Sequence, residues 1–208
     1  MQRILDAINI KQFQGLIFDC DGTLADTMPQ HFMAWQQVLG KHGISFDEDL
    51  FYAFAGQPTD VILAHLSKEQ SLEIDVALVT HEKESAFLEL LGEVEPLTPV
   101  VELAQKFHGE VPMGVGSGGQ REVVWQILRH LKIDDLFGCV VGSEDTERHK
   151  PEPDVFLEVA RRLEVPPEHC IVFEDADLGV EAARKAGMQC FDVRKIHTPR
   201  RLTQPDVS

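Results

Sequence analysis

The segment FDCDGTL, residues 18–24, places Asp19 and Asp21 directly after a short apolar run. Side chains alternate between the two faces of a strand, so residues two apart point the same way. Two neighbouring carboxylates repel each other unless a cation or a proton lies between them. The segment therefore predicts either a divalent metal site or a protonated carboxyl, with a solvated turn as the alternative. Both of the first two suit phosphoryl transfer, in which one Asp attacks phosphorus and its neighbour moves a proton.

Short apolar runs recur along the chain and alternate with helical patterns. The runs cover residues 15–18, 113–116, 138–141, 170–173 and 189–193. The helical segments between the later runs cover residues 99–107, 120–131, 153–163 and 177–186. This alternation predicts an α/β fold, with a Rossmann-like parallel sheet and helices on both of its faces. Ligands bind at the carboxyl ends of the strands in such sheets, so the chemistry is expected there.

The crossover after the first run is far longer than a single helix requires. Its residues TMPQ, 27–30, resemble a helix-capping box, and residues 74–91 form another long helical pattern. We expect residues 1–26 and 97–208 to form the α/β core and residues 27–96 to form a helical cap. Hinges at residues 26–27 and 95–98 would let the cap close over the strand ends.

Polar groups follow three further runs of the predicted sheet. Ser117 precedes two glycines at a helix start, where a hydroxyl and free backbone amides form a natural phosphate seat. Lys150 stands before a proline, and Glu174 and Asp175 form a carboxylate pair suited to a hard cation. Each group alone has an ordinary alternative, which is a helix cap for Ser117 and for the acids, and a solvated surface residue for Lys150. Their common position at strand ends favours one shared site.

Four motifs give the chain a family resemblance from residue 15 to residue 193. DCDGTLADT from Asp19, GSGG around Ser117, KPEPDVF from Lys150 and FEDADLGVEAARKAG from Phe173 resemble those of the haloacid dehalogenase-like hydrolases. The segment PQHFMAWQQVLGKHGI, residues 29–44, resembles the β-phosphoglucomutase-like sugar-phosphate branch. Within that branch, bacterial fructose-1-phosphate phosphatases are the nearest likeness.

The resemblance implies a role for each strand-end residue. Asp19 would be the nucleophile, and Asp21 the general acid for the leaving alkoxide and then the base for water. Mg²⁺ would be held by Asp19, the backbone carbonyl of Asp21 and Asp175, with Glu174 acting through water. Ser117 and the Gly118 amide would bind phosphoryl oxygens, and Lys150 would neutralise charge near Asp19.

Four cap residues are candidate substrate contacts. Gln57 and Thr59 lie in the expected loop of the cap that faces the core, although both could simply form the turn. His31 and Trp35 lie one helical turn apart and match ligand-facing positions of the branch. A solvated position is the alternative for His31, and the cap core is the alternative for Trp35.

Cationic side chains near the pocket would distinguish a phosphatase from a mutase, which moves a phosphoryl group from one position of a sugar to another. A mutase must bind a second phosphate, and the resemblance places an Arg near Thr59 and a Lys near Gln120 in mutases. This sequence has neither, which favours hydrolysis. Arg121 lies close enough to the second position to keep the mutase alternative open, whereas Glu144 and Asp145 are expected on a solvated turn.

Composition narrows the class of partner. The formal net charge of −16 argues against a nucleic acid or an anionic membrane. No continuous apolar stretch marks the first residues as a signal or membrane span, and the four cysteines lack metal or redox spacing. The polar tail, residues 195–208, is expected to be loosely ordered.

The patterns, together with what the resemblance implies, predict a cytoplasmic, Mg²⁺-dependent phosphatase of small sugar phosphates, of the fructose 1-phosphate or 6-phosphogluconate type. It would act through an aspartyl-phosphate, as a monomer or weak homodimer. β-Phosphoglucomutase activity is one alternative. A non-catalytic phosphometabolite-binding protein is another.

Overall fold

A computed structural model describes residues 1–202, and its centre is a five-stranded parallel sheet of order β5-β4-β1-β6-β7. The strands are β1 (Gly15–Phe18), β4 (Met113–Gly116), β5 (Cys139–Val141), β6 (Cys170–Glu174) and β7 (Gln189–Asp192). The central strands β1, β4 and β6 are buried along their whole length. Helices cover both faces, which is why these strands are apolar throughout rather than alternating. The α/β fold predicted from the sequence is therefore confirmed.

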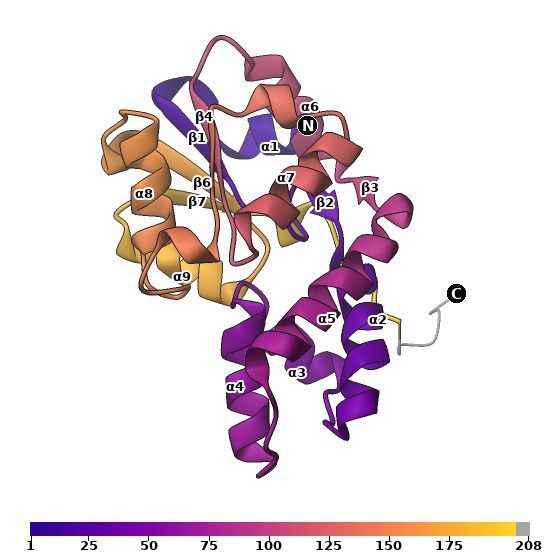
Figure 1. Ribbon diagram of the computed structural model, residues 1–208. Coiled ribbons are helices and arrows are strands. Elements are labelled where there is room, and N and C mark those ends of the chain that lie inside the picture. Colours follow the sequence, from indigo (N-terminus) through magenta and orange to yellow (C-terminus); the bar gives the residue numbers. More distant parts are fainter. Residues whose placement is uncertain (203–208) are drawn as a thin grey trace.

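Two helical layers enclose the sheet (Figure 1). One layer contains α1 (Gln2–Ala7), α6 (Thr98–Phe107) and α7 (Arg121–His130), and the other contains α8 (Asp154–Arg162) and α9 (Asp177–Lys185). Alternate residues of β1 serve the two layers. Leu16 and Phe18 belong to the apolar cluster of the first layer, and Ile17 belongs to that of the second. Neighbouring residues of one strand thus anchor opposite sides of the core.

Four helices form a separate group beyond the carboxyl ends of the strands (Figure 1). They are α2 (Met28–Leu39), α3 (Glu48–Ala53), α4 (Thr59–Glu69) and α5 (Val76–Glu89). Both chain crossings to this group run through a short antiparallel ribbon, in which β2 (Ala25–Asp26) pairs with β3 (Glu95–Pro96). We call the four helices and their loops the cap.

The expected capping box at Thr27 is absent. Thr27 precedes α2, but its backbone is already helical (φ −94°, ψ −13°) and its side chain makes no cap hydrogen bond. A side-chain cap needs an extended backbone at that position. The hydroxyl instead donates to Asp21 Oδ1 over 2.7 Å. A residue predicted to start a helix therefore supports the site.

The C-terminal tail contacts the cap, so the expectation of a loose tail is wrong as far as residue 202. Tyr52 on α3 donates to the carbonyl of Arg200 over 3.0 Å, and the Arg201 guanidinium lies 4.6 Å from the Tyr52 ring centre. Arg201 also pairs with Asp49 over 2.5 Å. Residues 203–208 lie outside the described part of the chain. The tail thus runs from β7 in the core to α3 in the cap.

No helix within residues 1–202 is both long and apolar enough to cross a bilayer. All four cysteines are unpaired thiols.

Candidate active site

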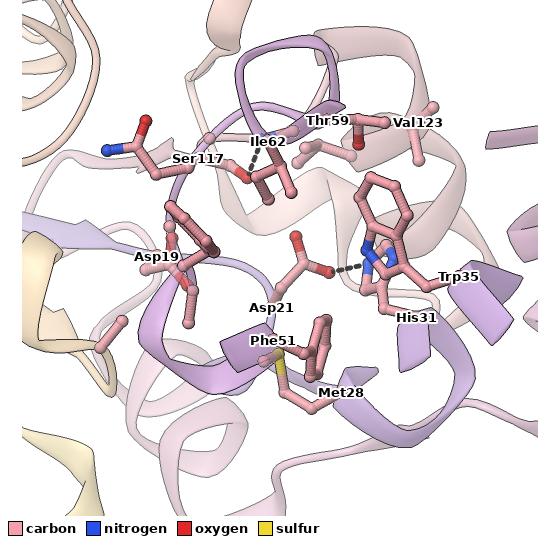
Figure 2. Close-up of a pocket in the computed structure, with 18 of the residues that line it drawn as sticks. Asp19, Asp21, Met28, His31, Trp35, Phe51, Thr59, Ile62, Ser117 and Val123 are labelled. Carbon is pink, nitrogen blue, oxygen red and sulfur yellow. Dashed lines mark hydrogen bonds and ion pairs between the residues drawn. The ribbon is translucent and has the colours of Figure 1, made fainter. Parts of the chain in front are cut away.

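The site lies where β1, β4 and β6 end beneath the cap. Core residues Asp19, Asp21 and Ser117 line one pocket together with cap residues, including His31 and Thr59 (Figure 2). Parallel strands bring their carboxyl ends to one edge, which is why residues distant in sequence meet here.

Lys150 connects two of the predicted acids. Its ammonium donates to Asp19 Oδ1 over 2.6 Å and to Glu174 Oε2 over 2.8 Å, and the residue is 1% exposed. Burial alone would lower the pKa of Lys150, but the carboxylates of Asp19 and Glu174 raise it above its usual value. Lys150 therefore stays a cation. Gln57 of the cap donates to the Lys150 carbonyl, so the cap touches the core at this residue.

Asp19, Glu174 and Asp175 form a buried acidic cluster. One carboxylate oxygen from each lies within 4.8 Å of the other two. Burial and the charge of Glu174 raise the pKa of Asp19 well above its usual value, and the same two causes raise the pKa of Asp175 to about 8. Lys150 compensates only part of this charge. Three oxygen donors with uncompensated negative charge fit a hard divalent cation.

A glycine makes room for this cluster. Gly22 has a left-handed backbone (φ +83°), and a Cβ there would lie 2.2 Å from Asp175 Oδ2. Any other residue would displace that carboxylate. Thr23, next in the chain, donates to Asp175 Oδ1 over 3.1 Å. The turn after β1 therefore positions a side chain that follows β6.

Asp21 has surroundings unlike those of Asp19. Its Oδ1 accepts from Thr27 over 2.7 Å. The same oxygen contacts His31 Nε2 over 3.0 Å (Figure 2). Burial would raise the pKa of Asp21, but His31 above all, then Thr27 and Lys83, lower it to about 2. Its Oδ2 lies toward the loop that follows β4, 3.8 Å from where a Cβ on Gly119 would stand. One oxygen contacts Thr27 and His31, and no hydrogen bond from residues 1–202 reaches the other.

A polar chain continues from Asp21 into the cap. Lys83 Nζ lies 2.9 Å from His31 Nδ1. An ammonium can only donate, so Nδ1 accepts, the ring proton lies on Nε2, and Nε2 donates to Asp21. Lys83 also donates to Glu84 Oε1 over 3.0 Å, and Thr59 donates to the same oxygen over 2.6 Å.

Lys83 and Glu84 were not predicted from the sequence. Both are buried charged residues on α5. A signal was available for Lys83, because it stands four residues after Val79 and four before Phe87, both of which are buried. That spacing puts a lysine in the middle of an apolar helix face.

The predicted cap residues all line the pocket, with different local contacts. Trp35 is 2% exposed and packs edge-on against Phe46, so it belongs both to the cap core and to the pocket wall. His31 stacks on Phe87 with ring centres 3.8 Å apart. The solvated alternative for His31 is therefore wrong.

The loop that follows β4, residues 117–120, touches the cap directly. Ser117 is 2% exposed, and its hydroxyl accepts from the Gly119 amide over 2.9 Å. A Cβ on Gly118 would lie 2.2 Å from the carbonyl oxygen of Gly56, in the loop between α3 and α4. Only a glycine at position 118 lets the two loops approach this closely. We call this contact the glycine seam.

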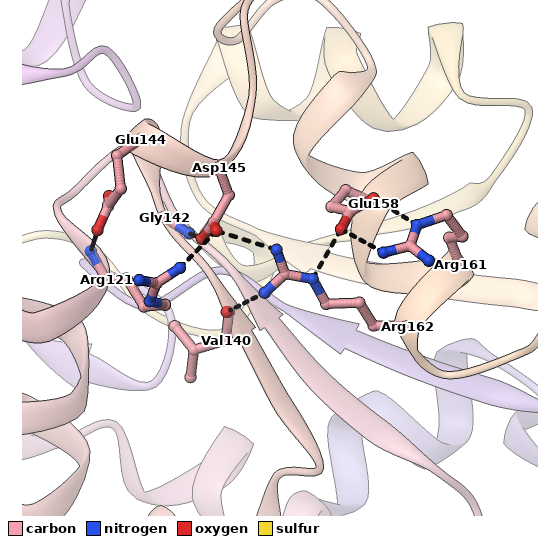
Figure 3. Close-up of polar contacts among 8 residues, drawn as sticks. All are labelled: Arg121, Val140, Gly142, Glu144, Asp145, Glu158, Arg161 and Arg162. Atoms are coloured by element: carbon pink, nitrogen blue, oxygen red, sulfur yellow. Dashed lines mark hydrogen bonds and ion pairs between the residues drawn. The ribbon is translucent and has the colours of Figure 1, made fainter.

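Arg121 does not line the pocket. Its guanidinium pairs with Asp145 over 2.5 Å, and Glu144 accepts from its backbone amide over 3.1 Å (Figure 3). Asp145 also pairs with Arg162 over 3.0 Å, so the expectation of a solvated Asp145 is wrong. The cation that kept the mutase alternative open is engaged elsewhere.

Comparisons with known proteins agree with this geometry. The chain is 42% identical over 185 residues to fructose-1-phosphate phosphatase YqaB of Escherichia coli, covering 88% of this chain and 98% of that protein. It is 34% identical over 180 residues to the phosphorylated carbohydrates phosphatase of Thermotoga maritima, covering 85% and 82%. The crystal structure of β-phosphoglucomutase from Clostridium difficile superposes with a TM-score of 0.76 at 26% identity, covering 86% and 83%. The profile of the haloacid dehalogenase-like hydrolases matches residues 16–193. The chain therefore belongs to the haloacid dehalogenase-like hydrolase family.

Proposed function

We propose that this protein is a Mg²⁺-dependent phosphatase that hydrolyses small sugar monophosphates through an aspartyl-phosphate. The observation that carries the proposal is the difference between the surroundings of Asp19 and Asp21, which are two residues apart. Asp19 lies in an acidic cluster beside Lys150, while Asp21 is held from the cap. The substrate class follows from the two phosphatases to which the chain is similar, whose names state fructose 1-phosphate and phosphorylated carbohydrates.

In the first half-reaction, a carboxylate oxygen of Asp19 attacks phosphorus, and the bond between phosphorus and the sugar oxygen breaks. Asp21 gives its proton to the departing sugar oxygen. The low pKa of Asp21 means that it is ionised without substrate. A phosphoryl group beside its Oδ2 adds negative charge, which favours uptake of a proton from water by Asp21, and this is the proton that the leaving oxygen receives.

In the second half-reaction, Asp21 takes a proton from water as the water oxygen attacks phosphorus. The bond between phosphorus and Asp19 breaks, which releases inorganic phosphate and restores the carboxylate. Ser117, the Gly118 amide and Lys150 bind the phosphoryl oxygens in both halves. Their donors oppose the charge that spreads over those oxygens in the transition state.

The acidic cluster suits Mg²⁺ because its oxygen donors outnumber the cations around them. Asp19, the Asp21 backbone carbonyl and Asp175 would hold the ion, with Glu174 acting through water. Bound there, Mg²⁺ supplies positive charge against the phosphoryl oxygens.

The cap residues Gln57, Thr59, His31 and Trp35 would enclose the sugar. Closure at the glycine seam excludes bulk water, and residues 26–27 and 95–98 serve as hinges.

The mutase remains a second candidate because of one observation, the cation Lys83. It lies on the side of the pocket formed by cap residues, which we call the cap wall, opposite the core wall formed by residues at the strand ends. A mutase would need Lys83 to bind a second phosphate, yet Lys83 already contacts Glu84 and His31. Hydrolysis requires no such cation.

Phosphate release tests the proposal. Fructose 1-phosphate, 6-phosphogluconate, β-glucose 1-phosphate and a nucleoside monophosphate would each be incubated with and without Mg²⁺, beside Asp19→Asn. We expect Mg²⁺-dependent release from a sugar phosphate that the variant loses. Conversion of β-glucose 1-phosphate into glucose 6-phosphate without release would identify the mutase. Binding without turnover would identify the non-catalytic alternative.

A further inference from the structure

We propose that Glu84 is a specificity residue of this pocket: it accepts a hydrogen bond from a sugar hydroxyl and repels a second phosphate. The inference rests on the proposed function, since it names which sugar phosphates the site takes.

Glu84 has one oxygen committed to the protein and one available. It lines the pocket from α5 and is 8% exposed. Its Oε1 accepts from Thr59 over 2.6 Å and from Lys83 over 3.0 Å. Among residues 1–202, no hydrogen bond reaches its Oε2. The first oxygen fixes the carboxylate in place, and the second presents acceptor positions to whatever occupies the pocket.

The charge of Glu84 is maintained by its neighbours. Burial would raise the pKa of Glu84, but the charge of Lys83 and the Thr59 hydrogen bond lower it below its usual value. An ionised carboxylate donates nothing, so Oε2 accepts hydrogen bonds only. A hydroxyl group satisfies it, whereas a phosphate oxygen does not.

The charge of Lys83 is already offset by Glu84, and two of its three N–H donors are engaged within the cap. Its ammonium contacts His31 Nδ1 and Glu84 Oε1, and it lies 5.3 Å from the centre of the Trp35 ring. The cap wall thus pairs its one lysine with its one glutamate. A second phosphate on the sugar would face the Glu84 carboxylate, and the lysine beside it is already paired with that carboxylate.

This arrangement determines which end of a bound substrate lies at each wall of the pocket. The transferred phosphoryl group belongs at the core wall, with Ser117 and Lys150, and the rest of the molecule extends toward the cap wall. A site built to accept a substrate hydroxyl discriminates strongly against analogues that lack it, since its buried acceptor is then unpaired. Glu84 is therefore placed to prefer hydroxyl-bearing monophosphates over bisphosphates.

Glu84→Gln tests the assignment, because glutamine keeps the size and can still accept from Thr59 and Lys83. The full-length enzyme would be assayed for kcat/KM with fructose 1-phosphate, fructose 1,6-bisphosphate and p-nitrophenyl phosphate, which carries no hydroxyl. We expect the preference for fructose 1-phosphate over each of the other two to fall about tenfold or more. Glu89→Gln is the matched control, since it makes the same change at an exposed position of the same helix.

The outcomes separate the two proposals. Equal losses on all three substrates, or unchanged preferences, would overturn the role of Glu84 while leaving the phosphatase in place. A wild-type enzyme that releases no phosphate from any of them would overturn the proposed function itself. If the variant does not fold, the wild type alone decides the matter. It must prefer fructose 1-phosphate over the bisphosphate by about tenfold or more, and equal rates would overturn the assignment.

Discussion

The two walls of the pocket satisfy their charges in opposite ways. The core wall and the residues directly beneath it gather three carboxylates near one buried lysine, and burial and the charge of Glu174 raise the pKa values of Asp19 and Asp175. The cap wall links His31, Lys83 and Glu84 in a chain whose polar contacts are complementary. Excess negative charge favours a bound cation, and a wall with paired charges suits the selection of a substrate. We therefore propose that chemistry and selection belong to different parts of the molecule.

Breaking the core wall at Asp19, the proposed nucleophile, should have the largest effect. We expect Asp19→Asn to lower phosphate release from sugar phosphates by roughly 10⁴-fold or more, because the amide cannot form the aspartyl-phosphate. Release of inorganic phosphate under Mg²⁺ would be measured beside Asp135→Asn, an exposed control. Appreciable turnover by the variant would exclude Asp19 as the nucleophile.

Removing the one lysine of the core wall should cost both activity and stability. Lys150→Met leaves Asp19 and Glu174 without their shared cation, and breaking a buried ion pair in this way costs about 3–5 kcal/mol. Urea unfolding in metal-free buffer measures the loss, with Lys68→Met at an exposed position of α4 as the control. Equal stability of the two variants would mean that the acids are already protonated without Lys150.

Breaking the contact between His31 of the cap and Asp21 of the core should reduce the rate of phosphate release with little change in substrate binding. His31→Gln disturbs the contact that holds Asp21 Oδ1, so we expect kcat to fall about 10–100-fold while KM changes little. His65→Gln, an exposed cap histidine, provides the comparison. A change in KM alone would mean that His31 acts only through the sugar that it helps to enclose, and not through Asp21.

Obstructing the glycine seam should give a smaller loss. An alanine at position 118 would place its Cβ 2.2 Å from the Gly56 carbonyl oxygen, which keeps the cap from closing fully. We expect roughly tenfold lower kcat and faster proteolysis of the cap. Gly92→Ala, whose Cβ would meet nothing within 4 Å, controls for the substitution itself. Full activity of Gly118→Ala would show that closure at this contact is unnecessary.

The tail contact should matter least. Arg201→Ala removes an ion pair with a largely exposed Asp49 and the contact with the Tyr52 ring, worth at most about 1 kcal/mol together. Thermal unfolding measures this shift, and Arg129→Ala removes a comparable surface pair from α7. A much larger loss would mean that the tail carries more of the cap's stability than these contacts indicate.

The sequence predicted the core wall better than the cap wall for a physical reason. Asp19, Ser117 and Glu174 each follow an apolar run, and parallel strands necessarily end at one edge. The position of each residue directly after a strand was therefore enough to predict that these side chains lie close together. The structure brings these side chains together, while the roles assigned to them remain predictions.

The cap wall depends on packing between helices, which a single sequence reveals poorly. Lys83 meets His31 only because α5 packs against α2, and the direction of Arg121 is decided by Asp145. Thr27 failed as a helix cap for a similar reason, since the hydroxyl binds Asp21 in the finished fold. Each of these errors concerns a polar side chain whose partner lies in another element.

The antiparallel ribbon of β2 and β3 has an evolutionary consequence. Ala25 faces Pro96 and Asp26 faces Glu95, so the chain leaves the core and returns to it at adjacent points. A different set of helices could be inserted between those points in one genetic event, because the ends of the insert already lie side by side. The acids and the lysine of the core would be untouched by such an exchange. New substrates could thus be acquired by replacing one continuous segment, without re-evolving the catalytic groups.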